Sequence, residues 1–270
     1  MDMINEIKLK WTLKEQDKEA NINLWDAKAD HFGDYTIPTI ENDKFIKLLK
    51  DENLISKDFK VLDIGCGGGK YTLALSKYCS NIQGIDLSPK MISYANENKI
   101  KLHINNASFS CDDWHELNVK KSNLYKKFDL VFASMTPAIQ SMSTFEKMNE
   151  ASKKYCVLRC NINRRDSVYD RLSENLNISQ QKENLNFLYA FNILYLKGYN
   201  PKIKYEEKTW YYKEPLAKAF DTYIKKIKTI RKINEDEEYK INEFLKNISH
   251  NGHIEEEISS TIATLIWNIK

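Results

Sequence analysis

The sequence has few glycines, no paired cysteines and no long apolar run, and each shortage excludes a class of protein. Its 270 residues include eight glycines, five prolines and five cysteines. No run approaches the roughly 18 apolar residues that a membrane-spanning helix needs. The cysteines are odd in number, scattered and without a C-x-x-C pair, which argues against a disulfide framework and a cysteine zinc site. We therefore expect reduced thiols and no membrane partner.

An excess of charge of one sign is also lacking. The chain has 41 Lys+Arg against 38 Asp+Glu, a formal net charge of +3. This balance gives no electrostatic reason to expect nucleic acid as the main partner. The first residues mix acids and bases and do not resemble a signal peptide, so we predict a cytoplasmic protein. The histidines His31, His103 and His115 lack the spacing of metal ligands, and we predict no metal site; the oligomeric state is left open.

The order of apolar segments predicts the fold class. Short apolar runs alternate with helical segments of ten or more residues, which is typical of an α/β protein with an open, mostly parallel, doubly wound sheet. About seven strands are expected, the last of them antiparallel. The predicted strands are Val61–Ile64, Ile82–Ile85, either Leu102–Ile104 or Ser108–Ser110, Leu130–Ala133, Tyr155–Cys160, Lys202–Tyr212 and Ser259–Trp267.

The chain shows no linker rich in Pro, Gly or Ser, so one decorated domain is favoured over two. Residues 1–59 are expected to form an N-terminal helical cap, and residues 60–270 a cofactor-binding domain. Within the second part, residues 213–250 are strongly charged and predict a helical insertion before the last strand.

Glycine is concentrated at one place. Four of the eight glycines lie within positions 65–69, directly after a predicted buried strand and before a predicted helix. Glycine lets the backbone lie close against a ligand, and a helix N-terminus offers free N–H groups. Because ligands of open α/β sheets bind beyond the carboxyl ends of the strands, this turn is the predicted binding site.

Two cofactor classes use a strand, glycine turn and helix. A dinucleotide fingerprint starting at Gly65 needs glycine at position 70, where the chain has Lys70, and it usually has an apolar residue in place of Asp63. The acid about 20 residues further on is present as Asp86, but both classes share it. The sequence therefore argues against a nicotinamide cofactor.

The segment VLDIGCGGG resembles the glycine motif of class I S-adenosylmethionine-dependent methyltransferases. This resemblance implies that the turn lies under the methionine part of S-adenosylmethionine, that the acid of the motif orients it, and that S-adenosylhomocysteine is the product. The residues implied at this turn are Asp63, Gly65, Cys66, Gly67 and Gly69.

The resemblance continues downstream in order and spacing. In the family, an acid in the position of Asp86 accepts hydrogen bonds from the ribose hydroxyls, with Leu87 and Met91 beside the adenine. The segment that follows the third strand places Asp113 at the adenine amino group and Trp114 beside the base, with Asp112 as the alternative acid. The fourth strand and the loop facing the methyl group match Phe128–Pro137, where Ser134 is implied at the cofactor.

The acceptor is constrained mainly by motifs that are missing. The Asn/Asp-Pro-Pro-Tyr segment of many nitrogen methyltransferases is replaced by residues 134–137, and no Pro-Cys of a cytosine-carbon enzyme occurs. The basic stretch Lys218–Lys232 reads as the solvated face of the inserted helix. We therefore expect a small-molecule acceptor and direct in-line displacement, with nucleic acid disfavoured. An RNA or protein methyltransferase, or a non-catalytic S-adenosylmethionine-binding sensor or partner domain, remains the alternative.

Two further expectations concern the rim of the site. The segment Trp25–Phe32 resembles the helix that lies over the cofactor in small-molecule members, so residues 20–40 are predicted to form a lid, with Tyr211 and Tyr212 lining the pocket. A base is needed only where the acceptor arrives protonated, and none is assigned. The candidate catalytic residues are His31, Tyr35, Ser134, Met135, Thr136 and Arg159.

Overall fold

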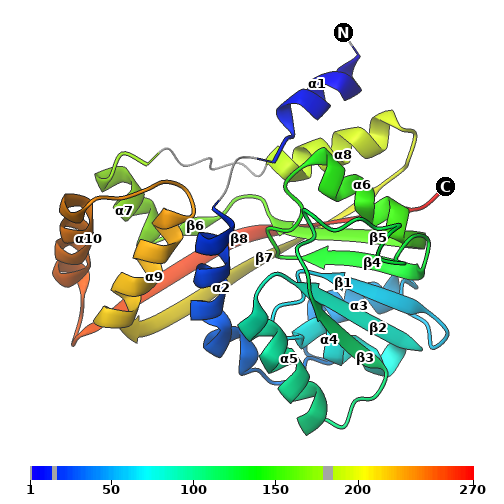
Figure 1. Ribbon diagram of the computed structural model, residues 1–270, viewed down its shortest axis with the longest axis horizontal. Helices are drawn as coiled ribbons and strands as arrows, with labels where there is room; N and C mark the ends of the chain where they lie inside the picture. The colour runs from blue at the N-terminus through cyan, green and yellow to red at the C-terminus, as the bar shows by residue number, and fades with distance from the viewer. Residues whose placement is uncertain (1, 14–16, 179–184) are drawn as a thin grey trace.

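A computed structural model of the chain describes residues 2–13, 17–178 and 185–270. Within these ranges the strands form a single eight-stranded sheet in the order β3-β2-β1-β4-β5-β8-β6, and β7 pairs with β8 (Figure 1). The strands are β1 (Lys60–Ile64), β2 (Asn81–Asp86), β3 (Ala107–Cys111), β4 (Phe128–Ser134), β5 (Ser152–Asn161), β6 (Arg165–Asp166), β7 (Lys202–Pro215) and β8 (His253–Asn268).

The sheet confirms the predicted class and adds one strand to the expected count. Strands β1 to β5 pair in parallel, whereas β8 is antiparallel to β5, β6 and β7. The extra strand is β6, which has only two residues and therefore carries no hydrophobic pattern. Of the two positions considered for the third strand, Ser108–Ser110 is confirmed.

Helices cover both faces of the sheet. Side chains of α3 and α4 share a buried cluster with one face, and side chains of α6 and α8 share another with the opposite face. In Figure 1 α6 and α8 lie above β5, and α3 and α4 overlap β1, β2 and β3. The helical segments are α1 (Met3–Lys10), α2 (Lys18–Gly33), α3 (Lys44–Asp51), α4 (Lys70–Leu75), η1 (Ser76–Tyr78), α5 (Pro89–Lys101), α6 (Met142–Ala151), α7 (Tyr169–Asn175), α8 (Leu185–Leu196), α9 (Leu216–Lys228) and α10 (Glu235–Ile248).

The N-terminal residues take part in two different regions. Within the expected N-terminal helical cap, α1 ends at Lys10 and α2 begins at Lys18, and residues 14–16 lie outside the described ranges. Helix α2 lies beside α5 and α9, while α3 buries Phe45, Ile46 and Leu49 in the core beneath the sheet. The predicted division at residue 59 stays a prediction.

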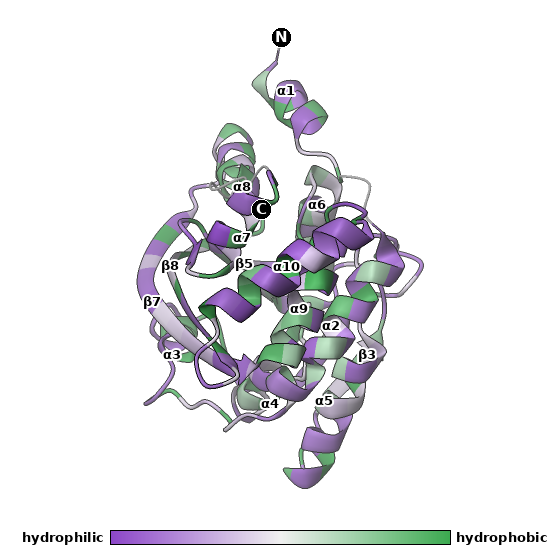
Figure 2. Cartoon of the chain, turned by 90° about the vertical axis from the view of Figure 1, so that its left-hand side faces the viewer, coloured by the Kyte–Doolittle hydropathy of each residue, from purple (hydrophilic) through white to green (hydrophobic). Residues whose placement is uncertain are grey.

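Strands β7 and β8 form a long hairpin that extends beyond the parallel sheet. Their pairing runs from Lys202 opposite Ile266 to Pro215 opposite His253. The helical insertion between them begins at Leu216, because β7 continues to Pro215. Helices α7, α9 and α10 bury their apolar sides together in a separate cluster. Figure 2 shows α10, α9 and α2 across this face of the molecule.

Candidate functional site

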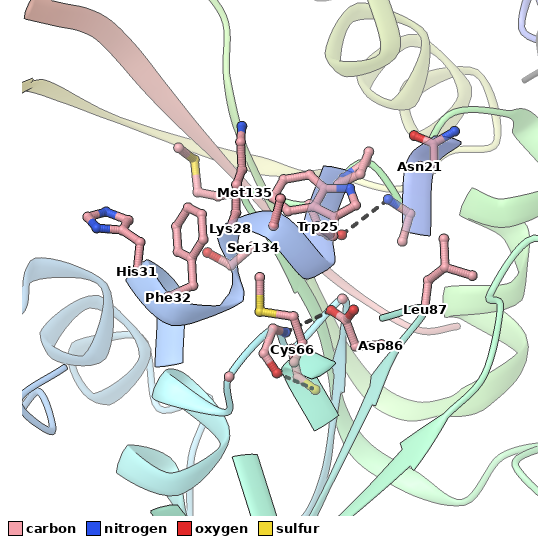
Figure 3. Close-up of a pocket in the computed structure, with 18 of the residues that line it drawn as sticks. Asn21, Trp25, Lys28, His31, Phe32, Cys66, Asp86, Leu87, Ser134 and Met135 are labelled. Carbon is pink, nitrogen blue, oxygen red and sulfur yellow. Dashed lines mark hydrogen bonds between the residues drawn. The ribbon is translucent and has the colours of Figure 1, made fainter. Parts of the chain in front are cut away.

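A cavity of about 1000 Å³ opens at the carboxyl ends of the central strands. Its floor is formed by the turns after β1, β2 and β4, and its cover by α2, β7 and α9. Figure 3 shows α2 on one side of Cys66 and Asp86. Pockets for small molecules typically measure about 300–1000 Å³, so this cavity lies at the upper end of that range. It has room for more than one ligand group.

The glycine turn forms part of the cavity wall. Gly65, Gly67 and Gly69 have φ of 68°, 53° and 85°, a region that side chains disfavour. At Gly65 a methyl group would also overlap the Thr136 side chain. At Gly68 it would lie 2.7 Å from the Phe32 carbonyl oxygen. The turn is therefore held tightly between the loop after β4 and the end of α2.

Asp86 ends β2 on the cavity wall. Its carboxylate accepts the N–H of Gly67 at 2.8 Å on one oxygen and the N–H of Ser88 at 2.9 Å on the other. Burial raises the pKa of this carboxyl, and the two N–H donors oppose that rise. The backbone thus fixes the carboxylate, while lone pairs on both oxygens stay available to the cavity.

Two residues of the predicted cofactor set lie behind the wall. Asp63 is 3% exposed and accepts a hydrogen bond from the Thr72 hydroxyl at 2.7 Å. Burial raises its pKa to about 7. Gly69 caps α4 and packs against Phe109 and Ala95. Neither residue is part of the cavity lining, so both support the turn from its buried side.

The segment after β3 lines the cavity beside Leu87 and Met91. Asp112 and Asp113 both face it, and Asp113 accepts the N–H of His115 at 2.9 Å. Trp114 is 2% exposed and donates its indole N–H to the Thr144 carbonyl at 3.0 Å. Trp114 therefore belongs to the core and to the cavity wall at the same time.

The loop after β4 has an unusual backbone. Met135 has φ of 57°, a left-handed conformation that is uncommon for a residue with a side chain, and donates its N–H to the Arg159 carbonyl at 2.7 Å. Strained residues cluster at ligand sites, and sequence reasoning had no signal for this one. The loop places Ser134, Met135 and Thr136 on the wall.

The remaining candidate catalytic residues are separated by the structure. Arg159 is on the wall, ion-paired to Glu206 at 2.9 Å and 3.5 Å from the Ser134 hydroxyl. His31 is also on the wall, with its ring 5.3 Å from that of Tyr212, and burial lowers its pKa. Tyr35 lies outside the lining and donates its hydroxyl to the Gly68 carbonyl at 2.6 Å.

Helix α2 covers the cavity through contacts with α5. Asp30 accepts the Tyr94 hydroxyl at 2.7 Å and pairs with Lys90 at 2.9 Å, and Asp26 accepts the Ser88 hydroxyl. At the end of α2, Asn98 donates to the Gly33 carbonyl at 2.8 Å. Ser88 also caps α5, so the cover and the turn after β2 share one residue.

The predicted lid over residues 20–40, Tyr211 and Tyr212 line one half of the cavity, but most side chains of that half were not singled out from the sequence. This half is lined by α2, by one face of β7, by α9 and by β8. The signal was present in β7, whose even-numbered residues from 206 to 214 are partly buried, whereas the odd-numbered residues between them are exposed, Tyr211 to 75%. The residues missed are Lys28, Asn161, Arg164, Lys208, Trp210, Glu214, Tyr223, Lys226 and Glu256.

No helix within the described ranges combines the length and apolarity needed to cross a bilayer. Among those same residues, no three His, Cys, Asp or Glu side chains converge as a metal site would require.

The sheet order, the glycine turn and the acid that ends β2 define a Rossmann-like, class I methyltransferase fold. Residues 55–214 match the family model described as a methyltransferase domain. Because this match covers more than half of the chain, the chain belongs to that family.

Relatives within the family act on different acceptors. The chain is similar to the ribosomal protein L11 methyltransferase of Lactobacillus gasseri, with 36% identity over 93 residues, which are 33% of this chain and 26% of the relative. It is also similar to the 23S rRNA (uracil(1939)-C(5))-methyltransferase of Aeromonas salmonicida, with 32% identity over 39% of this chain and 24% of the relative. The match thus spans about a quarter of these curated relatives.

A solved structure shows how widely the fold is shared. A phosphoethanolamine-type N-methyltransferase of Haemonchus contortus, in complex with S-adenosylhomocysteine, superposes with a TM-score of 0.53. The match covers 95% of this chain and 60% of that one, at 16% identity. At this identity the likeness concerns the fold alone.

Proposed function

We propose that the chain binds S-adenosylmethionine beside the glycine turn and transfers its methyl group to an acceptor. One observation carries this proposal: the Asp86 carboxylate is fixed by two backbone N–H groups and faces the cavity next to that turn. A carboxylate only accepts hydrogen bonds, which suits two neighbouring ribose hydroxyls. At Gly67 a methyl group would meet nothing nearer than the Met91 sulfur at 3.9 Å, so the turn has open space above it.

The other residues of this half fit the remaining parts of the cofactor. Leu87, Met91 and Trp114 offer apolar surface for the adenine, and Asp113 or Asp112 a carboxylate for its amino group. Asp63 is buried beneath the turn and does not contact the ligand. It accepts a hydrogen bond from Thr72 of α4 and so holds the N-terminus of that helix in place. S-adenosylmethionine, when it is bound, supplies an electrophilic methyl group on its sulfonium sulfur.

The protein's own contribution to the reaction is position and enclosure. Holding two reactants in line contributes much of the rate of a displacement. The Ser134–Thr136 loop and Arg159 lie between the two halves of the cavity wall, and α2 covers the opening. Water is thereby kept from the reacting groups. No side chain is assigned as a base.

We propose further that the acceptor is a small molecule. The support is the enclosure of the second half by α2, β7 and α9 and the near-neutral charge of the chain. The relatives that modify rRNA or a ribosomal protein favour the alternative of a macromolecular acceptor. A domain that binds the cofactor without turnover is the third candidate.

Calorimetric titration with S-adenosylhomocysteine tests the cofactor, with NAD as the control ligand. We expect S-adenosylhomocysteine to bind with micromolar affinity and NAD not to bind. No binding of S-adenosylhomocysteine, or binding of NAD in its place, would overturn the proposed function.

A further inference from the structure

Positive charge gathers on the part of the cavity wall that α2, α9 and the loop before β6 form. Lys28 comes from α2, Arg164 from the loop before β6, and Lys226 from α9, and all three line the cavity. These elements are far apart in the sequence and meet only in the fold (Figure 1). In Figure 3 the Lys28 side chain points away from Asp86.

Two of these cations share a single carboxylate. The Arg164 guanidinium binds Asp166 through Nε at 2.5 Å and Nη2 at 2.9 Å, and the Lys226 ammonium lies 3.1 Å from the same side chain. The Asp166 side chain is 5% exposed. The Lys226 ammonium also lies 3.4 Å from the Tyr169 ring centroid. One buried anion thus balances two cations.

Lys28 has no such partner. Among the described residues its ammonium makes no ion pair or hydrogen bond, and it lies over the Trp25 ring, 5.4 Å from the centroid. Burial, together with the charges of Lys226 and Arg164, lowers the pKa of Lys28 to about 8, although the charges of Glu256 and Asp166 oppose that fall. A buried ammonium beside two other cations is a costly arrangement that an anion would relieve.

The nearby acids do not remove this excess. Glu256 accepts the N–H of Tyr169 at 3.3 Å and interacts with the Tyr223 hydroxyl, and its charge acts on both Lys226 and Lys28. Glu214 is half-buried, and Lys218 and Lys28 are the cations that act on it. When the exposed Lys218 is counted with Lys28, Arg164 and Lys226, against Asp166, Glu214 and Glu256, this part of the cavity still carries one more positive charge than negative charges.

We propose that the methyl acceptor carries an oxyanion, a carboxylate or a phosphate, which binds Lys28 between Lys226 and Arg164. This inference rests on the proposed function and specifies its substrate class. Charge-assisted hydrogen bonds to an oxyanion are short and strong, and they would anchor the acceptor at one end. Trp25, Trp210 and Tyr212 line the cavity around this anchor, so the remainder of the acceptor would meet aromatic surface.

The test measures anion binding to protein saturated with S-adenosylhomocysteine, at constant ionic strength. The probes are benzoate, inorganic phosphate and the neutral benzamide. We expect at least one anion to bind and benzamide to bind at least about tenfold more weakly. Lys28→Met should weaken anion binding at least about tenfold, and Lys28→Arg should restore it to within a few-fold. Lys226→Met should also weaken it.

The control is Lys225→Met, which removes the neighbouring lysine on α9. Lys225 pairs with Asp221 at 2.7 Å and is not part of the lining, so anion affinity should not change. Anion affinity that is equal in wild type and Lys28→Met, or no anion binding to wild type, overturns the inference. Both results leave the proposed function standing, provided that S-adenosylhomocysteine binds; its failure to bind would count against the proposed function itself.

Discussion

Each residue of the glycine turn meets a different physical constraint. At position 65 a side chain is excluded both by the positive φ and by the Thr136 side chain. Gly67 also has a positive φ, but a side chain there would have open space around it. Gly68 has an ordinary backbone conformation, and its constraint is the backbone of α2. One short motif thus joins three elements, so substitutions within it should have separable effects.

Asp86 is the residue on which cofactor binding should depend most. Asp86→Ala removes charge-assisted hydrogen bonds worth roughly 1.5–3 kcal/mol each, and we expect the dissociation constant for S-adenosylhomocysteine to rise at least about tenfold. Calorimetry measures this rise. Because Asp86 also accepts the N–H groups of Gly67 and Ser88, the melting temperature and circular dichroism of the variant must show that it is folded. An unchanged dissociation constant in the folded variant would contradict the assignment.

Asp63 should affect stability in a way that depends on pH. Its pKa is raised to about 7 in the folded state from an ordinary value near 3.8, so the folded protein binds more protons than the unfolded chain between these values. This carboxyl therefore makes the free energy of unfolding fall as pH rises from about 4 to about 7, with no further change above. We expect Asp63→Asn to remove that slope and to gain roughly 2–4 kcal/mol at pH 8 relative to wild type.

Urea unfolding at pH 5, 6, 7 and 8 measures the difference. Comparing the two proteins at each pH cancels the other titrating groups, and Asp129→Asn serves as a second acid-to-amide variant. The Asp129 carboxylate accepts the N–H of Lys60 at 2.9 Å and pairs with Lys154 at 3.1 Å, so its loss should destabilise the protein. Parallel pH profiles for wild type and Asp63→Asn would show that the carboxyl is not perturbed.

The place of a site residue in the fold could be predicted from the sequence where its position along the chain decides it. An acid at the end of a parallel strand reaches the ligand edge of the sheet, and Asp86 lies there on the cavity wall. Position along the chain does not show whether a residue at the glycine turn faces the cavity or the buried side, and Asp63 and Gly69 lie on the buried side. The left-handed Met135 follows from the loop closing onto Arg159, a contact between distant residues.

At the scale of elements, the cover of the cavity depends on α2. The helix lies on α5 through polar contacts such as those of Asp30, and its interface with α9 completes the cover. Exposed ion pairs contribute little to stability, so we expect α2 to open locally more easily than the sheet. A ligand that binds beneath α2 should stabilise the covered state.

We therefore expect S-adenosylhomocysteine to slow amide hydrogen exchange within residues 20–40 more than in α10. Mass spectrometry of peptides from both segments measures this directly, and α10 serves as the internal reference because it does not line the cavity. Tyr94→Phe, which deletes the hydroxyl donated to Asp30, should speed exchange in α2 without ligand. Exchange in residues 20–40 that is insensitive to the ligand would contradict the lid.

Gly68→Ala should disturb the same element from the opposite side. The added methyl would lie 2.7 Å from the Phe32 carbonyl oxygen and 3.0 Å from the Gly33 Cα, and backbone atoms cannot rotate away. We expect faster exchange at the end of α2 and at least several-fold weaker binding of S-adenosylhomocysteine. The control is Gly252→Ala, where a methyl meets nothing within 4 Å. That change costs roughly 1–2 kcal/mol of backbone strain and should leave binding unchanged.

Elements were predictable where their pattern was long and periodic. The strands around the glycine turn and the helix that begins at Pro89 carry strong local signals, the latter through the Ser88 cap. Strand β6 has two residues, and its place is set by pairing with β8. The inward face of β7 was readable from its alternation, and the resemblance placed residues 20–40 over the site, but the side chains that α9 contributes to the cavity were not predictable from the sequence.

At the scale of the whole molecule, the long hairpin and its insertion enlarge a widespread fold at one end. The family match ends at residue 214, just before α9, and the second half of the cavity lies where α9 and β8 join the common part. The relatives match this chain only over short segments of their own length, and their acceptors differ. Acceptor choice should therefore depend on the enclosing elements rather than on the shared sheet.

This enclosure predicts which class of molecule receives the methyl group. The protein is incubated with S-adenosylmethionine carrying a tritiated methyl group and with three fractions of a cell extract: small molecules, RNA and protein. We expect label in the small-molecule fraction, retained on an anion-exchange resin as an oxyanion requires. Lys28→Met should reduce this label and Lys225→Met should not. Label in RNA or protein would instead mean that α2 opens to admit a chain, and the small-molecule proposal would be wrong.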